Sequence, residues 1–100
     1  MNITISSPHL VITSTLEEQV QTKFTHISKM FDRIESCDVL LKKEENDKWE
    51  KYIAEARLLV PGKTLFATER AKTFEIALDE LVDDIKHQLR RYKVEHAEVR

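Results

Sequence analysis

The chain is poor in residues that several classes of protein need. Among its 100 residues there is one cysteine and one glycine. A single cysteine cannot form an internal disulfide, and a single glycine cannot supply the glycine-rich loop that holds a nucleotide phosphate. No apolar run approaches the roughly 20 residues of a membrane span, and the first residues lack the basic start and apolar core of a signal peptide. We therefore expect a cytoplasmic protein with no membrane partner.

Residues that act in catalysis or metal binding are present but scattered. The four histidines lie in different predicted elements, and no pair has metal-ligand spacing; they are His9, His26, His87 and His96. The adjacent Asp83 and Asp84 would point about 100° apart on a helix, so they do not form a catalytic pair of carboxylates. Cys37 sits in an apolar strand pattern, which favours a buried, unreactive thiol. The sequence thus predicts a protein that is not an enzyme and has no metal, no cofactor and no small-molecule substrate.

Hydrophobic spacing predicts one α+β domain with the element order β-α-β-β-β-α. The expected elements are a strand over 2–6, a helix from 13–15 to about Ile34, a strand from Cys37 into the charged segment 42–51, strands over 52–60 and 65–70, and a helix over 73–93. Because a helix joins the first two strands, they should pair in parallel, whereas the others form an antiparallel meander. Each helix carries one apolar stripe, so both should pack side by side on one face of this four-stranded mixed sheet.

Local signals set the expected ends of these elements. A capping box, with a hydroxyl residue at 14 or 15 and a glutamate three residues later, should begin the first helix, and Thr73 should cap the last one. The Asn-Asp pair at 46–47 is the expected tip of a hairpin. The Pro-Gly pair at 61–62 predicts a type II turn, in which glycine takes the positive φ angle.

The last helix has its acidic residues first and its basic residues last. Residues 73–85 contain five acids and no base, and residues 86–93 contain four bases and no acid. The helix dipole favours this order only within the first and last turns, by a few tenths of a kcal/mol per residue. A chain with a formal net charge of −2 can still bind a polyanion, because binding follows the local potential. The basic end of the helix is therefore a candidate site for a polyanion.

The first helix adds a second row of basic residues beside its apolar stripe. They are Lys23, His26, Lys29 and Arg33. If the two helices pack side by side, this row and the bases at 86–93 could face one groove and bind phosphates. Arginines can also grip a phosphate with two hydrogen bonds or stack on an exposed base. On these residues alone, RNA binding and an ordinary charged surface remain alternatives.

The sheet face away from the helices is expected to mix charged and apolar residues. Its apolar members are Leu40, Ile53, Leu59 and Phe66. Edge protection or weak self-association explains this mixture more simply than a dedicated binding site. A protein–protein interaction module that uses this face stays open as an alternative function.

Four motifs occur in a characteristic order along the chain. They are Lys-Phe at 23–24, Phe-Asp-Arg-Ile at 31–34, Lys-Thr-Phe-Glu-x-Ala-Leu-Asp at 72–79, and His-Gln-Leu at 87–89 followed by bases. In this order and spacing the chain resembles, over nearly its whole length, the short ribosome hibernation promoting factors. These proteins are also called ribosomal subunit interface or ribosome-associated inhibitor proteins.

The resemblance implies a βαβββα domain related in shape to double-stranded RNA-binding domains. It implies a single ribosome-binding domain over residues 1–100, with an ordered core of about 2–95. Such proteins bind the small ribosomal subunit against 16S rRNA near the decoding centre and block mRNA and tRNA during starvation or stationary phase. We expect this chain to be a monomer when bound, and its oligomeric state in solution stays open. The implied rRNA-binding residues are Lys23, Lys29, Lys86, Arg90, Arg91 and Lys93, with His26, Arg33 and His87 as additional candidates. A general double-stranded RNA binder is the remaining alternative.

The sequence departs from the family at three basic positions. A family lysine is His26 here, and a lysine and an arginine of the last helix are Asp84 and His87. These changes lower the positive charge of the expected surface, and Arg90 and Arg91 partly restore it. The sequence also ends at Arg100 without the C-terminal dimerisation domain of the family's long form, so we do not expect it to pair ribosomes through its own tail.

Overall fold

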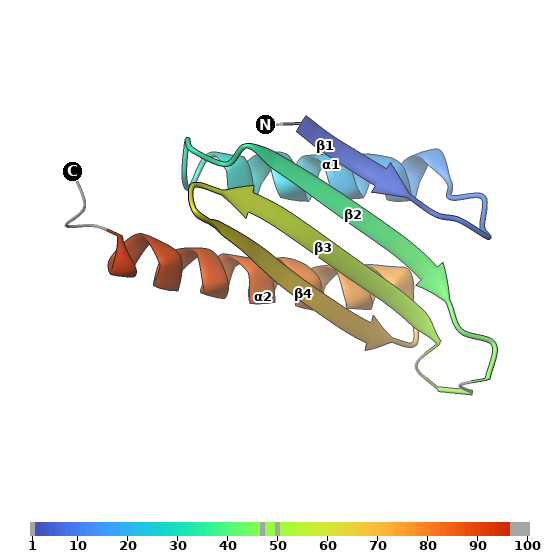
Figure 1. Cartoon of the computed structure of the whole chain (residues 1–100). Coiled ribbons are helices and arrows are strands. Elements are labelled where there is room, and N and C mark those ends of the chain that lie inside the picture. Colours follow the sequence, from blue (N-terminus) through green and yellow to red (C-terminus); the bar gives the residue numbers. More distant parts are fainter. Residues whose placement is uncertain (1, 47, 50, 97–100) are drawn as a thin grey trace.

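The predicted order of elements and the mixed sheet are confirmed in the computed structural model, which describes residues 2–46, 48–49 and 51–96. The elements are β1 (Asn2–Ser6), α1 (Ser14–Ser28), β2 (Ser36–Lys43), β3 (Tyr52–Val60), β4 (Lys63–Ala71) and α2 (Phe74–Glu95). The strands lie in the order β1-β2-β3-β4; β1 pairs in parallel with β2, and the other pairs are antiparallel. Both helices cover the same face of the sheet (Figure 1).

The core lies between the sheet and the two helices. Alternate residues of the strands point into it, and Val39, Ala56 and Leu58 are at most 1% exposed. The helices contribute side chains at three- and four-residue spacing that are fully buried; they are Val20, Phe24, Ile27, Ala77, Leu78, Leu81, Ile85 and Leu89. The apolar stripes read from the sequence are therefore the buried sides of the helices.

The two helices run in the same direction along the sheet (Figure 1). This follows from the topology, because each helix comes after a strand and runs back against it, and β1 and β4 both run parallel to β2. The beginnings of α1 and α2 therefore lie at one end of the molecule and their last turns at the other. The acidic first half of α2 is thus on the side of the molecule where α1 begins, and its basic second half is on the side where α1 ends.

The predicted extent of the first helix is wrong at its C-terminal end. α1 stops at Ser28, where the amide of Met30 donates to the carbonyl of Ile27 at 2.9 Å in a tighter turn. The chain has to turn here to enter β2 at Ser36. Phe31 and Ile34 still reach the core from outside the helix, since Ile34 is 6% exposed and the Phe31 ring meets Tyr92 edge-on at 5.6 Å.

The caps and turns agree in part with their predictions. Thr73 caps α2 as predicted, but α1 is capped by Thr13, whose Oγ1 accepts from the amide of Leu16 at 3.1 Å. The capping boxes expected at 14 or 15 are therefore wrong, because those residues already lie inside the helix. Gly62 has the predicted positive φ, at 75°. Asn46 lies in a turn, while Asp47, the other half of the expected hairpin tip, lies outside the described residues.

Charged side chains shield part of the apolar outer face of the sheet. Ile53 is only 5% exposed, and its neighbours on the adjacent strands are Lys42 and Arg70. Lys42 pairs with Glu55 at 2.7 Å, and Arg70 with Glu44 at 2.9 Å, so their aliphatic stems are held across this face. Phe66 and Leu59 remain 49% and 40% exposed.

Candidate nucleic-acid interface

The last turns of both helices and the loop after α1 bring most of the predicted basic residues to one end of the molecule, while Lys23 and Lys86 lie nearer the middle of their helices. Most of them are exposed: His26, Lys29, Arg33, His87, Arg90, Arg91 and Lys93. Lys23 and Lys86 are half-buried. A parallel pair of helices therefore concentrates positive charge where both helix C-termini lie, and cations are also favoured there by the helix dipoles.

Two of the predicted residues connect the helices to each other. The Lys23 Nζ lies 2.7 Å from the Asp79 Oδ1, so a base of α1 pairs with an acid of α2. The Lys93 Nζ donates to the carbonyl oxygen of Met30 at 2.8 Å, which ties the end of α2 to the turn after α1. Both ammonium groups thus have partners within the protein, and both contacts link α2 to α1 or to the turn that follows it.

The predicted bases of α2 do not all face one groove. Each helix residue is rotated by about 100° from the one before it, so Lys86 and Lys93, seven residues apart, share the flank toward α1 with Asp79, and Arg90 lies next to them. Arg91 is turned toward β4, where with His87 and Lys63 it lines a hollow of about 270 Å³. The expectation of a single groove is therefore corrected: the bases form two rows, one on each flank of α2.

The β4 flank contains two residues, Gln88 and Lys63, that are not among the predicted rRNA contacts. Gln88 donates from its Nε2 to the Asp84 Oδ1 at 2.9 Å and to the carbonyl of Phe66 at 2.8 Å, so it joins α2 to β4. Lys63, at the start of β4, lines the same hollow as Arg91. The sequence marks Gln88 only as part of the His-Gln-Leu motif and Lys63 not at all, because the roles of both depend on the packing of α2 against β4.

The β4 flank of α2 also brings acidic side chains close to one another. Burial, a hydrogen bond with Asp84 and repulsion from Asp84 and Glu80 raise the pKa of Glu69 above its usual value of 4.5. Glu69 therefore holds its proton more tightly in the folded state than in the unfolded chain. The contribution of this proton to the stability of the fold is fully present below the pKa that Glu69 has in the unfolded chain. It is lost as the pH rises through the pKa of Glu69 in the folded protein.

We expect Glu69→Gln to raise the thermal midpoint at pH 7, because the amide can still donate to Asp84 but carries no charge. It should also flatten the decrease in stability between pH 4.5 and pH 7. Thermal unfolding at both pH values checks this result. An equal change in the thermal midpoint at the two pH values would contradict a raised pKa of Glu69 in the folded protein.

The end of α2 is anchored by its aromatic residue Tyr92. Its hydroxyl donates to the carbonyl of Pro61 at 2.6 Å, its ring packs edge-on against Phe31, and His96 stacks on it at 4.1 Å. Helix α2 is thus fixed to the β3–β4 hairpin and to the turn after α1. This anchoring holds the basic rows in place.

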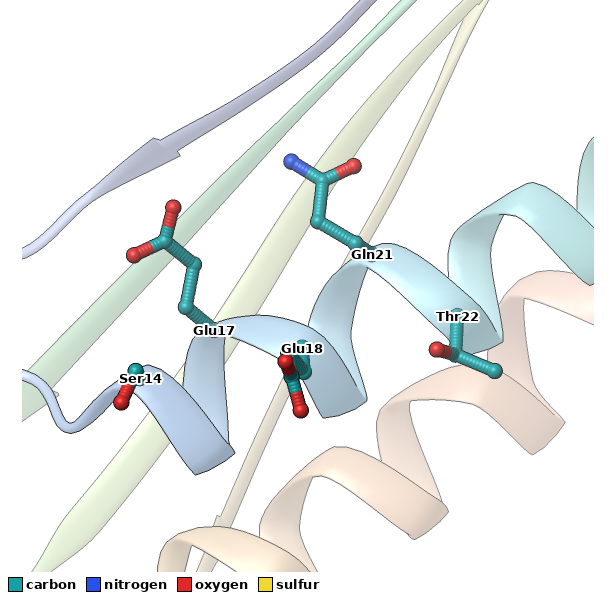
Figure 2. Close-up of a pocket in the computed structure, with 5 residues that line it drawn as sticks. All are labelled: Ser14, Glu17, Glu18, Gln21 and Thr22. Carbon is teal, nitrogen blue, oxygen red and sulfur yellow. The ribbon is translucent and has the colours of Figure 1, made fainter.

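The opposite end of the helix pair has the opposite charge. A shallow hollow there is lined by Ser14, Glu17, Glu18, Gln21 and Thr22, and Figure 2 shows that these residues all come from the first turns of α1. Its carboxylates repel phosphates, so this hollow is not part of a nucleic-acid interface. The helix pair therefore has an acidic end and a basic end.

Other kinds of site find little support. Within residues 2–46, 48–49 and 51–96, no three His, Cys, Asp or Glu side chains are grouped so that they could hold a metal ion. None of the described helices has the length and apolar character needed to cross a membrane. Cys37 is buried as predicted, and burial, with a smaller effect of Asp38, raises the pKa of its thiol to about 12, which keeps it unreactive.

The chain is similar to known proteins over nearly its whole length. Residues 3–96 match the family described as Sigma 54 modulation protein / S30EA ribosomal protein. A ribosome hibernation promoting factor from Acinetobacter guillouiae is 37% identical over 99 residues, covering 93% of this chain and 88% of that protein. A protein of the same name from Salmonella typhimurium is 33% identical over 93 residues, covering 93% of this chain and 94% of that protein.

Two solved structures have the same fold. A ribosomal subunit interface protein from Coxiella burnetii aligns with a TM-score of 0.84 at 23% identity, covering 94% of this chain and 99% of that one. The N-terminal domain of Thermus thermophilus Protein Y aligns with a TM-score of 0.78 at 26% identity, covering 92% of this chain and 99% of that one. At its low identity, the first similarity is one of fold alone.

Proposed function

The chain belongs to the Sigma 54 modulation protein / S30EA ribosomal protein family, and we propose that it is a hibernation factor that binds the small ribosomal subunit near the decoding centre. There it blocks mRNA and tRNA and stops translation during starvation or stationary phase. The ribosome-binding hibernation role is supported by the names of the relatives that match the chain over nearly all of its length. The family is ribosome-associated and is no known enzyme class, and a ribosome-bound factor acts in the cytoplasm.

The observation that carries this proposal is the separation of charge along the parallel helix pair. The basic end presents two rows of cations, and the acidic end carries carboxylates such as Glu17 and Glu18. A polyanion such as 16S rRNA is therefore attracted at one end and repelled at the other, which orients the domain as it approaches. We propose that the basic end contacts rRNA and that the rest of the domain fills the channel used by mRNA.

The residues proposed to contact rRNA differ in how free their charges are. Lys29, Lys86, Arg90 and Arg91 carry the main contacts, because none of the contacts described above occupies their charged groups. Their cations replace the counterions of phosphates, so each contact adds to the salt dependence of binding. The ammonium groups of Lys23 and Lys93 already have partners within the protein, so they contribute less to phosphate binding. His26 shares a hollow with Lys29, and His87 shares one with Arg91, so both extend the surface. Arg33 is exposed in the segment after α1 and is kept as an additional candidate.

We expect Asp79→Asn to tighten ribosome binding. The substitution removes an acid from the flank of α2 that faces α1, and it frees the ammonium of Lys23 for a phosphate. Stability should change by less than about 1 kcal/mol, because the Asp79 side chain is 64% exposed and exposed ion pairs contribute little. Titration of labelled small subunits checks the affinity. Weaker binding would mean that the Lys23–Asp79 pair is needed to shape the surface.

The experiment that tests the proposed function is co-sedimentation with purified small ribosomal subunits through a sucrose gradient. We expect the protein to move with the subunits and to stay bound when free duplex RNA is added in excess. Loss to the duplex would indicate a general double-stranded RNA binder. Absence from the subunit fractions, in low salt as well, would contradict the proposal and favour a protein–protein module.

A further inference from the structure

The outer edge of β1 is an open strand edge without the usual protection. β1 is the first strand of the sheet, and within the described residues no other strand pairs with its outer side. Edge strands normally carry charges, a proline or a bulge that prevents pairing with another chain. All five residues of β1, Asn2–Ser6, are uncharged, and the central Ile3, Thr4 and Ile5 are β-branched residues suited to a strand.

The apolar side chains of β1 are incompletely covered. Ile3 and Ile5 are half-buried, although they pack against the core cluster. Their direct partners on β2, Cys37 and Val39, are 0% and 1% exposed. Apolar surface is therefore left open along this edge on the helix side of the sheet.

We propose that the β1 edge pairs with the β1 edge of a second copy of this chain. The strand reads nearly the same in both directions, as polar-Ile-Thr-Ile-polar. In an antiparallel pair centred on Thr4, a two-fold axis places Thr4 opposite Thr4, Ile3 opposite Ile5, and Asn2 opposite Ser6. Threonine pairs and β-branched pairs stabilise such ladders, and no like charges meet. The isoleucines of both copies become covered on the helix side.

The opposite edge of the sheet is protected, so the assembly closes as a dimer. On β4 the side chain of Gln88 occupies the carbonyl of Phe66, and Lys63, Glu69 and Arg70 put charges along the strand. A dimer through β1 has β4 at both ends of an eight-stranded sheet, so it does not extend into a fibre. Pro8, two residues after β1, also limits the paired segment.

The helices are compatible with this arrangement. Figure 2 shows that Glu17 and Gln21 point to the side of α1 that faces away from α2. In the dimer this side of α1 would lie nearest the α1 of the second copy. Because the two α1 helices would run antiparallel, the two Glu17 carboxylates would lie at opposite ends and would not repel each other closely.

Five residue pairs make a small interface, so we expect a weak dimer with a dissociation constant of about 10⁻⁴ M. Sedimentation equilibrium at low salt measures it. Thr4→Lys places two ammonium groups opposite each other at the centre and should weaken the dimer about fivefold. Mixing Thr4→Lys with Thr4→Glu should restore association as a heterodimer. Thr68→Lys, an exposed threonine on β4, is the matched control and should leave the dimer unchanged.

Three results would overturn the proposal. The first is a wild-type protein that stays monomeric up to about 1 mM, and the second is a Thr4→Lys variant that dimerises like the wild type. The third is a dimer that is lost in Phe66→Ser instead, because this result would place the contact on the outer sheet face. A monomeric wild-type protein that binds an extended peptide at β1 would assign the edge to a foreign strand. Thermal unfolding confirms that each variant folds. Neither Thr4 nor Thr68 is among the proposed rRNA contacts, so subunit co-sedimentation of these variants tests the proposed function separately.

Discussion

Replacing Arg90 and Arg91 together by alanine is expected to weaken binding to the small ribosomal subunit about 10- to 100-fold near 0.1 M salt. The two arginines lie on different flanks of α2, so the double variant removes one cation from each basic row. Both side chains are exposed, and alanine favours helix, so the fold should be retained. The expected loss comes from phosphate contacts and not from unfolding.

The salt dependence of binding distinguishes a loss of phosphate contacts from a loss of the fold. Two lost phosphate contacts should reduce the slope of log affinity against log salt concentration by roughly 1.4 to 1.8. Glu17→Gln with Glu18→Gln is the matched control, because it also removes two charges but at the acidic end. It should leave binding unchanged or slightly tighter. An unchanged slope in the arginine variant would show that these residues do not contact phosphates.

Replacing Phe24 by alanine is expected to reduce the free energy of unfolding by about 3–5 kcal/mol. The ring is fully buried beneath α1. Removing it leaves a cavity between α1 and the sheet, because the surrounding core can relax only in part. Small domains are stable by about 5–15 kcal/mol, so much of the total stability would be lost.

The lost stability weakens the packing of α1 that holds the basic residues of the two helices in place. Thermal unfolding and urea titration measure the change, and the thermal midpoint should decrease by about 15–30 °C. Thr25→Ala, the next residue on the exposed side of α1, is the control and should change stability by less than about 0.5 kcal/mol. If Phe24→Ala cost less than about 1 kcal/mol, the burial of α1 against the sheet would be wrong.

The fold could be predicted from the sequence because its signals are local. Alternating residues in β3 and the three- and four-residue spacing in α2 identify their buried sides directly. The extent of α1 was overestimated for a physical reason. Phe31 and Ile34 continue the helical spacing of apolar residues, but they reach the core from the turn that leads into β2.

The candidate site could be predicted only as a region. The sequence identified the basic residues and the helices that carry them. It could not show that Lys23 pairs with Asp79, because that contact depends on the relative direction and offset of two helices. It also could not separate Arg90 from Arg91, since adjacent residues lie on different flanks only once α1 and β4 are placed. Lys63 was missed for the same reason.

The measurement that tests the central claim most directly is competition between this protein and the ligands of the decoding centre. Small subunits are first loaded with mRNA and tRNA, and labelled protein is then added and sedimented with them. The basic end of the helix pair is proposed to occupy that channel, so we expect binding to empty subunits and little or none to loaded ones. Equal binding to empty and loaded subunits would contradict the account.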